Sequence, residues 1–318
     1  MNDNNSLLHY ESIEITTKNS EQYGYLCAFI CQFLWGINGL QLKSFQFLFP
    51  KIYSINSFIF WRSVPIWYLG YFFSKRNNII ITPYNKIENK FWFLCRTAGN
   101  FLFILLYMLQ LNYFRISTCQ CVINCNPVIV LLLVVIILKE KFYIRYLMGI
   151  LLSLIGSFLI IFNEKKPNHE NKTYHNNILL GSFFSFCNVM VLAFSCFGLK
   201  IICNEGMKPE IQNYYLGLYN TIPGLILMLI EKRTGLSNII YCIYGLSNGF
   251  LFYAANYYMS EAVGNMPISK YLPISYLNIV FIFIFGFLFF NEGVYIGDLI
   301  GSSMIIGFQL YNLYIPLK

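Results

Sequence analysis

Long apolar runs separated by short polar breaks follow one another along most of the chain, from Gln22 to the C-terminus. Each run has about the 18 or more residues that a helix rising 1.5 Å per residue needs to cross a hydrocarbon layer of about 30 Å. Backbone polar groups in lipid must be hydrogen-bonded within their own segment, so the runs are predicted to be helices. The pattern predicts an all-α membrane protein with ten transmembrane helices, at about 23–42, 52–74, 91–113, 117–138, 143–162, 178–200, 211–230, 238–259, 267–290 and 294–314.

The end of the fourth expected helix matches the end of the ninth. Leu138-Lys139-Glu140 closes the fourth, Phe290-Asn291-Glu292 closes the ninth, and Gly149 or Gly301 follows at the same interval. Glu140 and Glu292 are 152 residues apart, about half of the 318-residue chain. A membrane pattern that returns at half length predicts two copies of a five-helix bundle, and because five is odd, the second copy must be inverted. The expected parts are a polar N-terminal tail (1–21), a first repeat (22–162), a linker loop (163–177) and a second repeat (178–318).

The charged residues are few and stand mainly at helix ends. They make up 11% of the chain, whereas soluble proteins carry about 25%. The net charge of +8 therefore does not indicate nucleic-acid binding. With a cytosolic N-terminus, the cytosolic breaks carry eleven Lys and Arg residues and the opposite breaks carry eight, so both termini are predicted to be cytosolic. The glycosylation sequon at Asn171 would then face the lumen or the outside, and its use stays open.

Three cations, Arg62, Arg96 and Lys270, fall within expected helices, and no acidic residue lies in the middle of any. A charge at membrane depth costs at least about 2.5–3.5 kcal/mol, so it is usually paired, cavity-facing or extended to the interface. Arg96 is expected to extend to the cytosolic interface. Arg62 and Lys270 are expected either to line a cavity or to serve the fold. A positive interior favours an organic anion as the solute.

Uncharged polar residues gather on the third, fourth, eighth and ninth helices, where they either bond across helices or line a cavity. They include Gln120 and Tyr253. The candidate substrate-binding residues are Lys270, Arg62, Asn100, Tyr107, Asn124, Asn256 and Tyr276. Pro127 removes one backbone hydrogen bond and is expected to kink the fourth helix. Gly149, Gly156, Gly297 and Gly301 are expected to permit close helix packing.

Metal binding and catalysis receive no support from the sequence. Cys119, Cys121 and Cys125 have a metal-like spacing, but they lie in an apolar run without histidine, so we interpret them as packing residues. No HExxH, GxSxG, P-loop or GxGxxG motif occurs in a suitable context. We therefore predict no catalytic residue, metal or cofactor, and no enzyme. All three histidines lie outside the expected helices, which favours exchange or facilitated movement over proton symport.

In order and spacing, several short motifs resemble the drug/metabolite transporter superfamily in its EamA-type branch, and most of all the G-type members of solute carrier family 35. The resemblance covers roughly Gln22 to Tyr314. In the first half it rests on Trp35-Gly36-Ile37-Asn38, Arg62, Cys95-Arg96, Gly99, Pro127, Leu138-Lys139-Glu140 and Gly149. In the second half it rests on Tyr276, Phe290-Asn291-Glu292, Gly301 and Ile305-Ile306-Gly307. It implies two inverted five-helix halves, a central cavity and alternating access.

The sequence therefore predicts a secondary transporter in the lipid bilayer that moves a small organic solute, more specifically an anion, by exchange or facilitated movement. One alternative is a nucleotide-sugar antiporter of the Golgi or endoplasmic reticulum. Another is a membrane protein that regulates partners without carrying solute. The identity of the solute, the membrane and the oligomeric state stay open.

Overall fold

The computed structural model describes residues 3–48, 55–81, 87–110, 113, 122–139, 144–163, 178–230, 239–290 and 296–314. Nearly all of these residues are helical, and they contain no strand. The linker with Asn171, the cysteines Cys119 and Cys121, Gln120, and the helix-ending Glu140 and Glu292 lie outside these ranges.

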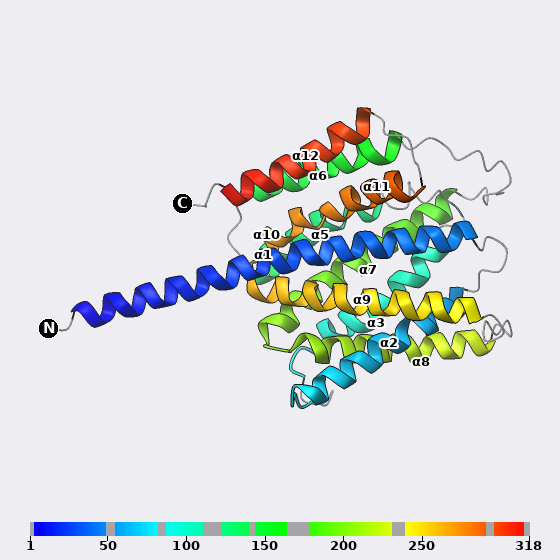
Figure 1. Cartoon of the computed structure of the whole chain (residues 1–318), viewed down its shortest axis with the longest axis horizontal. Helices are drawn as coiled ribbons and strands as arrows, with labels where there is room; N and C mark the ends of the chain where they lie inside the picture. The colour runs from blue at the N-terminus through cyan, green and yellow to red at the C-terminus, as the bar shows by residue number, and fades with distance from the viewer. Residues whose placement is uncertain are drawn as a thin grey trace.

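The helices of the described ranges run side by side with their long axes nearly aligned (Figure 1). They are α1 (Asp3–Leu48), α2 (Ile55–Arg76), α3 (Lys90–Gln110), α5 (Asn126–Leu133), a π-helical turn η2 (Val134–Leu138), α6 (Ile144–Asn163), α7 (Ile178–Asn204), α8 (Pro209–Ile230), α9 (Ile239–Asn265), α10 (Ile268–Ile274), α11 (Leu277–Phe290) and α12 (Ile296–Tyr314). Since η2 continues α5, and α10 and α11 are the two parts of one broken helix, these elements make ten helical segments. The predicted number of helices is confirmed for the described part of the chain.

Two features of the helices differ from the prediction. The polar residues 3–21, expected to form a tail, are helical and continuous with the first segment, so α1 projects beyond the bundle (Figure 1). Pro127 does not bend the middle of a helix. A turn at Asn124 and Cys125 interrupts the helix, and Pro127 lies in the first turn of α5, where its missing N–H costs nothing.

A similar break separates α10 from α11. Pro273 lies near the end of α10, and a turn at Ser275 and Tyr276 follows before α11 begins. The backbone N–H of Ser275 still donates to the carbonyl of Tyr271 at 3.1 Å, so the chain direction is kept through the turn. Among the described residues, one broken helix thus lies in each half of the chain.

The helices pack in a regular set of pairs. α2 packs against α8, and α6 packs against α12; in each pair the two helices hold the same place in the two halves of the chain. α3 packs against α7, while α1 packs against α9. The largest core cluster is built from α1, α5, α6, α7, α9, α10, α11 and α12, with Tyr276, Phe197 and Ile150 among its most deeply buried side chains.

Glycines make the contact between α6 and α12 close. A Cβ atom at Gly149 would overlap the ring of Phe308, and one at Gly156 would lie 2.7 Å from the carbonyl oxygen of Gly301. A larger side chain at Gly156 must displace the α12 backbone, whereas at Gly149 the Phe308 ring must turn away. The prediction that Gly149 and Gly156 serve packing is confirmed.

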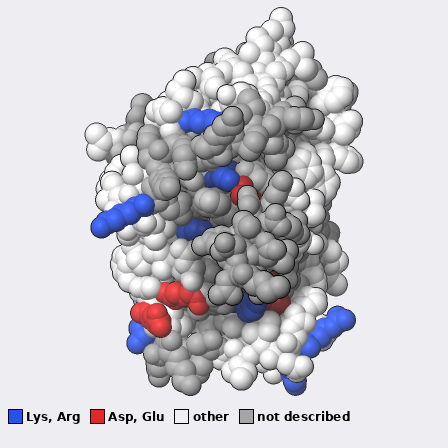
Figure 2. Space-filling view, turned by 90° about the vertical axis from the view of Figure 1, so that its left-hand side faces the viewer, with Lys and Arg blue, Asp and Glu red and all other residues white. Residues whose placement is uncertain are grey.

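Two helical stretches among the described residues are long and apolar enough to cross a membrane, Leu179–Asn204 and Ile268–Phe289. Shorter apolar stretches occupy Asn126–Leu138, Leu147–Gly156 and Leu299–Phe308. Large apolar side chains such as Leu179 and Phe289 are exposed on the outer surface. By contrast, Figure 2 shows charged side chains at the surface of the bundle end from which α1 projects.

Candidate functional site

A buried arginine lies among several helices of the bundle. Arg96, in the second turn of α3, is only 4% exposed. Its Nη2 donates to Oδ1 of Asn256 on α9 at 2.6 Å, and its Nε is buried without a hydrogen-bond partner. No carboxylate of the described residues forms an ion pair with Arg96. The expectation that Arg96 extends to the interface is therefore wrong, because its side chain points into the bundle toward α9.

Side chains from several other helices complete a polar cluster around Arg96. Cys31, Cys196 and Tyr271 are near enough to interact electrostatically with the guanidinium. Tyr271 on α10 accepts a hydrogen bond from Gln32 Nε2 of α1 at 3.0 Å. Asn126 Nδ2 of α5 lies 3.7 Å from Cys196 Sγ on α7. We call Gln32, Arg96, Asn126, Cys196, Asn256 and Tyr271 the central cluster.

Asn256 of the central cluster belongs to a row of buried residues on one face of α9. Asn248, Phe252, Asn256 and Ser260 follow one another at intervals of four residues and are all buried, so they share one helix face. Asn256 Nδ2 donates to the carbonyl of Phe252 at 3.0 Å, and Ser260 Oγ donates to the carbonyl of Asn256 at 2.9 Å. Asn256 Oδ1 faces Arg96 of α3, and Asn248 Nδ2 faces Gln41 of α1.

Arg62 contacts the same face of α9, at Phe252, one turn away from the Asn256 that binds Arg96. It lies on α2 and is 7% exposed, with its guanidinium carbon 3.9 Å from the centroid of the Phe252 ring. Trp35 of α1 contacts the same ring edge-on, with a centroid distance of 5.0 Å. A cation over an aromatic face is attracted by the ring quadrupole. Arg62 is thus held at α9 by stacking.

The two helix breaks meet each other directly. The hydroxyl of Tyr276, at the α10–α11 break, donates to the backbone carbonyl of Asn124, at the break before α5, at 2.8 Å. Nδ2 of Asn124 and Oδ1 of Asn100 are buried without a hydrogen-bond partner. Asn100 is one turn beyond Arg96 on α3, so these two side chains leave the helix on the same face.

Two of the predicted site residues lie away from this centre. Tyr107 is partly exposed and stacks on Phe103, with ring centroids 6.1 Å apart. Lys270 forms an ion pair with Glu21 of α1, and the two side chains are 19% and 35% exposed. The structure thus brings Asn256 together with Arg96, Arg62 onto the neighbouring turn of α9, and Asn124 together with Tyr276. It does not bring Lys270 or Tyr107 into that set.

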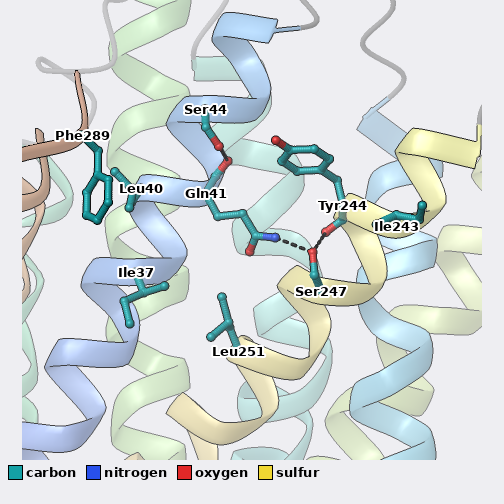
Figure 3. A pocket seen from close by; sticks show the side chains of 9 residues that line it. All are labelled: Ile37, Leu40, Gln41, Ser44, Ile243, Tyr244, Ser247, Leu251 and Phe289. Carbon is teal, nitrogen blue, oxygen red and sulfur yellow. Dashed lines mark hydrogen bonds between the residues drawn. The ribbon is translucent and has the colours of Figure 1, made fainter.

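A lateral groove of about 520 Å³ opens where the polar face of α9 begins (Figure 3). Its lining is mostly apolar, but Gln41 of α1 donates to Ser247 Oγ and accepts from Asn248 Nδ2 at 3.2 Å. The groove is lined by Ile37, Leu40, Gln41, Ser44, Ile243, Tyr244, Ser247, Leu251 and Phe289. The α9 face that begins at this groove leads through Asn248 and Phe252 to Asn256 of the central cluster.

Comparison with known proteins agrees with this architecture. Among curated protein sequences, none matches the chain. A crystal structure of a protein with 11% sequence identity superposes with a TM-score of 0.72, covering 92% of this chain and 99% of that one. At such low identity the likeness shows the fold alone. The family model described as the EamA-like transporter family matches residues 22–162. Residues 22–162 are therefore similar to an EamA-like transporter domain, which supports a likeness to the drug/metabolite transporter superfamily.

Proposed function

We propose that the protein is a secondary transporter that moves a small organic anion across a membrane by alternating access. The observation that carries this proposal is Arg96, a buried cation among several helices that no described carboxylate neutralises. Burying a charge is costly unless the charge is paired. A carboxylate or phosphate group of the solute would supply the missing partner, and Nε of Arg96 would supply an unused donor.

The proposed topology is ten membrane-crossing helices in two inverted five-helix repeats, with both termini in the cytosol. The helix pairing supports it, because α2 packs on α8 and α6 packs on α12, each helix against its counterpart in the other half. Asn124 and Tyr276 are 152 residues apart, the interval found between the repeated sequence motifs, and they are hydrogen-bonded to each other. Equivalent residues that touch must lie close to a two-fold pseudo-axis between the halves.

In the proposed site, Arg96 and Asn256 bind the anionic group of the solute. Arg62, Asn100, Asn124 and Tyr276 line the same path, as predicted from the sequence. Lys270 and Tyr107 contact the solute only during its entry or exit, since they lie outside the central cluster. Within the superfamily, we keep the likeness to the G-type members of solute carrier family 35 as part of this proposal.

Counterflow in proteoliposomes tests the proposal. Purified protein is reconstituted with a panel of carboxylates, phosphorylated metabolites, nucleotide sugars and amino acids inside, and uptake of each labelled compound is followed. We expect saturable exchange confined to anions and abolished by Arg96→Gln. Arg76→Gln is the matched control, because it makes the same change at an exposed position at the end of α2. Exchange of neutral solutes that Arg96→Gln leaves unchanged would refute the anion site.

A further inference from the structure

We propose that Asn100 and Asn126 bind a hydroxyl group of the solute beside its anionic group, so that the protein selects hydroxylated organic anions. This inference rests on the proposed anion site at Arg96 and specifies its substrate class. It follows from side-chain atoms near Arg96 that are buried and have no hydrogen-bond partner among the described residues.

Three buried asparagines each keep one amide atom unbonded within the described part of the chain. Asn100, Asn124 and Asn126 are between 7% and 9% exposed. The unbonded atoms are Oδ1 of Asn100, Oδ1 of Asn126 and Nδ2 of Asn124. A buried polar group without a partner is costly, so each such group calls for a ligand or a water molecule that completes its hydrogen bonds. The asparagines thus add two acceptors and one donor to the unused Nε donor of Arg96.

Asn126 lies at the same level of the bundle as Arg96. Ser195 Oγ of α7 donates to the backbone carbonyl of Arg96 at 3.4 Å, and Sγ of the next residue, Cys196, lies 3.7 Å from Nδ2 of Asn126. The Cys196 side chain is also near enough to interact electrostatically with the guanidinium. Because Nδ2 of Asn126 faces Cys196, Oδ1 is the amide atom that remains for a solute bound at Arg96.

Asn100 supplies a second acceptor one helical turn from Arg96. The two residues are four apart on α3. Side chains at this interval leave a helix on the same face, with their Cβ atoms about 5–6 Å apart. A hydroxyl on a carbon close to the anionic group of the solute can therefore reach Asn100 or Asn126 while that group is bound at Arg96.

The charge at the site favours a hydroxyl over an ammonium group, although both can donate to an amide oxygen. An ammonium group would lie beside the Arg96 guanidinium, with which no described carboxylate forms an ion pair. Like charges repel at such a distance. A hydroxyl donates without a charge, and it can also accept from a donor such as Nδ2 of Asn124. Hydroxy acids should therefore bind more tightly than amino acids.

The test compares compounds that share one anionic group and differ in one substituent. Propionate, lactate, 3-hydroxypropionate and alanine form a carboxylate series, and propyl phosphate and glycerol 3-phosphate form a phosphate series. The panel anion that exchanges fastest is compared with its own deoxy analogue. Inhibition of counterflow in proteoliposomes and thermal stabilisation of the purified protein are both measured.

We expect the better hydroxy acid to bind roughly ten- to hundredfold more tightly than propionate. This is the range expected when buried polar groups are deprived of their partner, because a deoxy analogue excludes water from the amides without replacing it. Alanine should bind no more tightly than propionate. A hydroxyl preference in only one of the two series would identify carboxylate or phosphate as the anionic group.

Variants assign the preference to the two asparagines. Asn126→Leu and Asn100→Leu keep the approximate size of the side chain and remove the amide, so each should bring the hydroxylated anion toward the affinity of its deoxy analogue without weakening the analogue. Asn220→Leu is the matched control. Asn220 of α8 is 1% exposed and its Oδ1 also has no partner among the described residues, but it shares a helix face with Gly224, which packs against the α2 backbone. The control should leave the preference unchanged.

Equal affinity of hydroxylated anions and their deoxy analogues for the unmodified protein would overturn the inference and leave anion transport standing. The amides would then bind water instead. Tighter binding of alanine than of lactate would also overturn it, since the donor would be an ammonium group. Absence of binding and exchange for every anion would instead overturn the proposed function. Because these comparisons use the unmodified protein, they do not depend on whether the asparagine variants fold.

Discussion

Asn256→Asp is the substitution that tests the central site most sharply. The side chain keeps its size and shape, and its oxygen already lies 2.6 Å from Nη2 of Arg96. The change converts a hydrogen bond between a neutral amide and a cation into a full ion pair. Arg96 would then carry its own permanent counter-ion.

The expected loss of anion affinity follows from the short distance between residue 256 and the Arg96 guanidinium. A carboxylate about 4 Å from the charge centre of a guanidinium interacts with it by about 4 kcal/mol at an effective dielectric constant of about 20. A solute anion must compete with that interaction, and each 1.4 kcal/mol corresponds to about a tenfold change in affinity. We therefore expect the apparent affinity for the anion to fall by about two to three orders of magnitude. The melting temperature should stay the same or rise, because a buried charge has gained a partner.

The assay is counterflow of the labelled anion in proteoliposomes, run beside thermal unfolding in detergent. Asn256→Ala is the companion variant, since it removes the hydrogen bond but leaves the positive charge available, and it should weaken transport only modestly. Equal transport by Asn256→Asp and Asn256→Ala would show that Arg96 does not bind the anion. Such a result would refute the proposed role of the central cluster.

Three further predictions concern other parts of the fold. Gly156→Leu should destabilise the protein by about 1–3 kcal/mol, the usual cost of overpacking, because a side chain there meets the α12 backbone. Thermal unfolding measures this loss. The control is Gly307→Ala, whose added Cβ meets nothing within 4 Å and which should be neutral or stabilising. Tyr276→Phe should cost about 1–3 kcal/mol, because a buried carbonyl loses its 2.8 Å hydrogen bond; an unchanged unfolding midpoint would contradict this. Lys270→Ala should lower anion uptake and Glu21→Ala should raise it, if the Lys270 ammonium attracts anions at the bundle end; equal uptake by both variants would remove Lys270 from the path.

The number of helices could be predicted because each helix corresponds to one contiguous apolar run, whose length can be read from the sequence alone. Each run of apolar residues is long enough for a helix whatever it packs against, and the glycines that allow α6 and α12 to approach stand in those runs. The breaks were harder to foresee. Pro127 indicated a local disturbance, but only the structure shows that the helix stops at Asn124 and restarts at α5.

The direction of a long side chain could not be predicted in the same way. Arg96 is two turns or less from the start of α3, which suits a side chain that extends to the interface, yet it bonds Asn256 of a helix 160 residues away. Lys200, the last residue of the sixth expected helix, is 7% exposed and donates to the carbonyls of Val263 and Met266 at 3.0 and 3.2 Å. Both side chains find partners that are distant in sequence. The spacing of Arg96 and Asn100 on one face, without an acidic residue at that depth, was the available signal for the site.

The hydrogen bond between Tyr276 and Asn124 has a consequence for the energetics of the transport cycle. In the proposed inverted arrangement, the inward-open and outward-open states are related by exchanging the roles of the two halves. Two identical halves would give these states equal energy. Here a side chain of the second half binds the backbone of the first, and the reciprocal contact is not made, since Nδ2 of Asn124 is buried without a hydrogen-bond partner among the described residues. The contact between the halves is thus unequal, and in the proposed transport cycle this one bond would favour one resting side of the membrane for the empty protein.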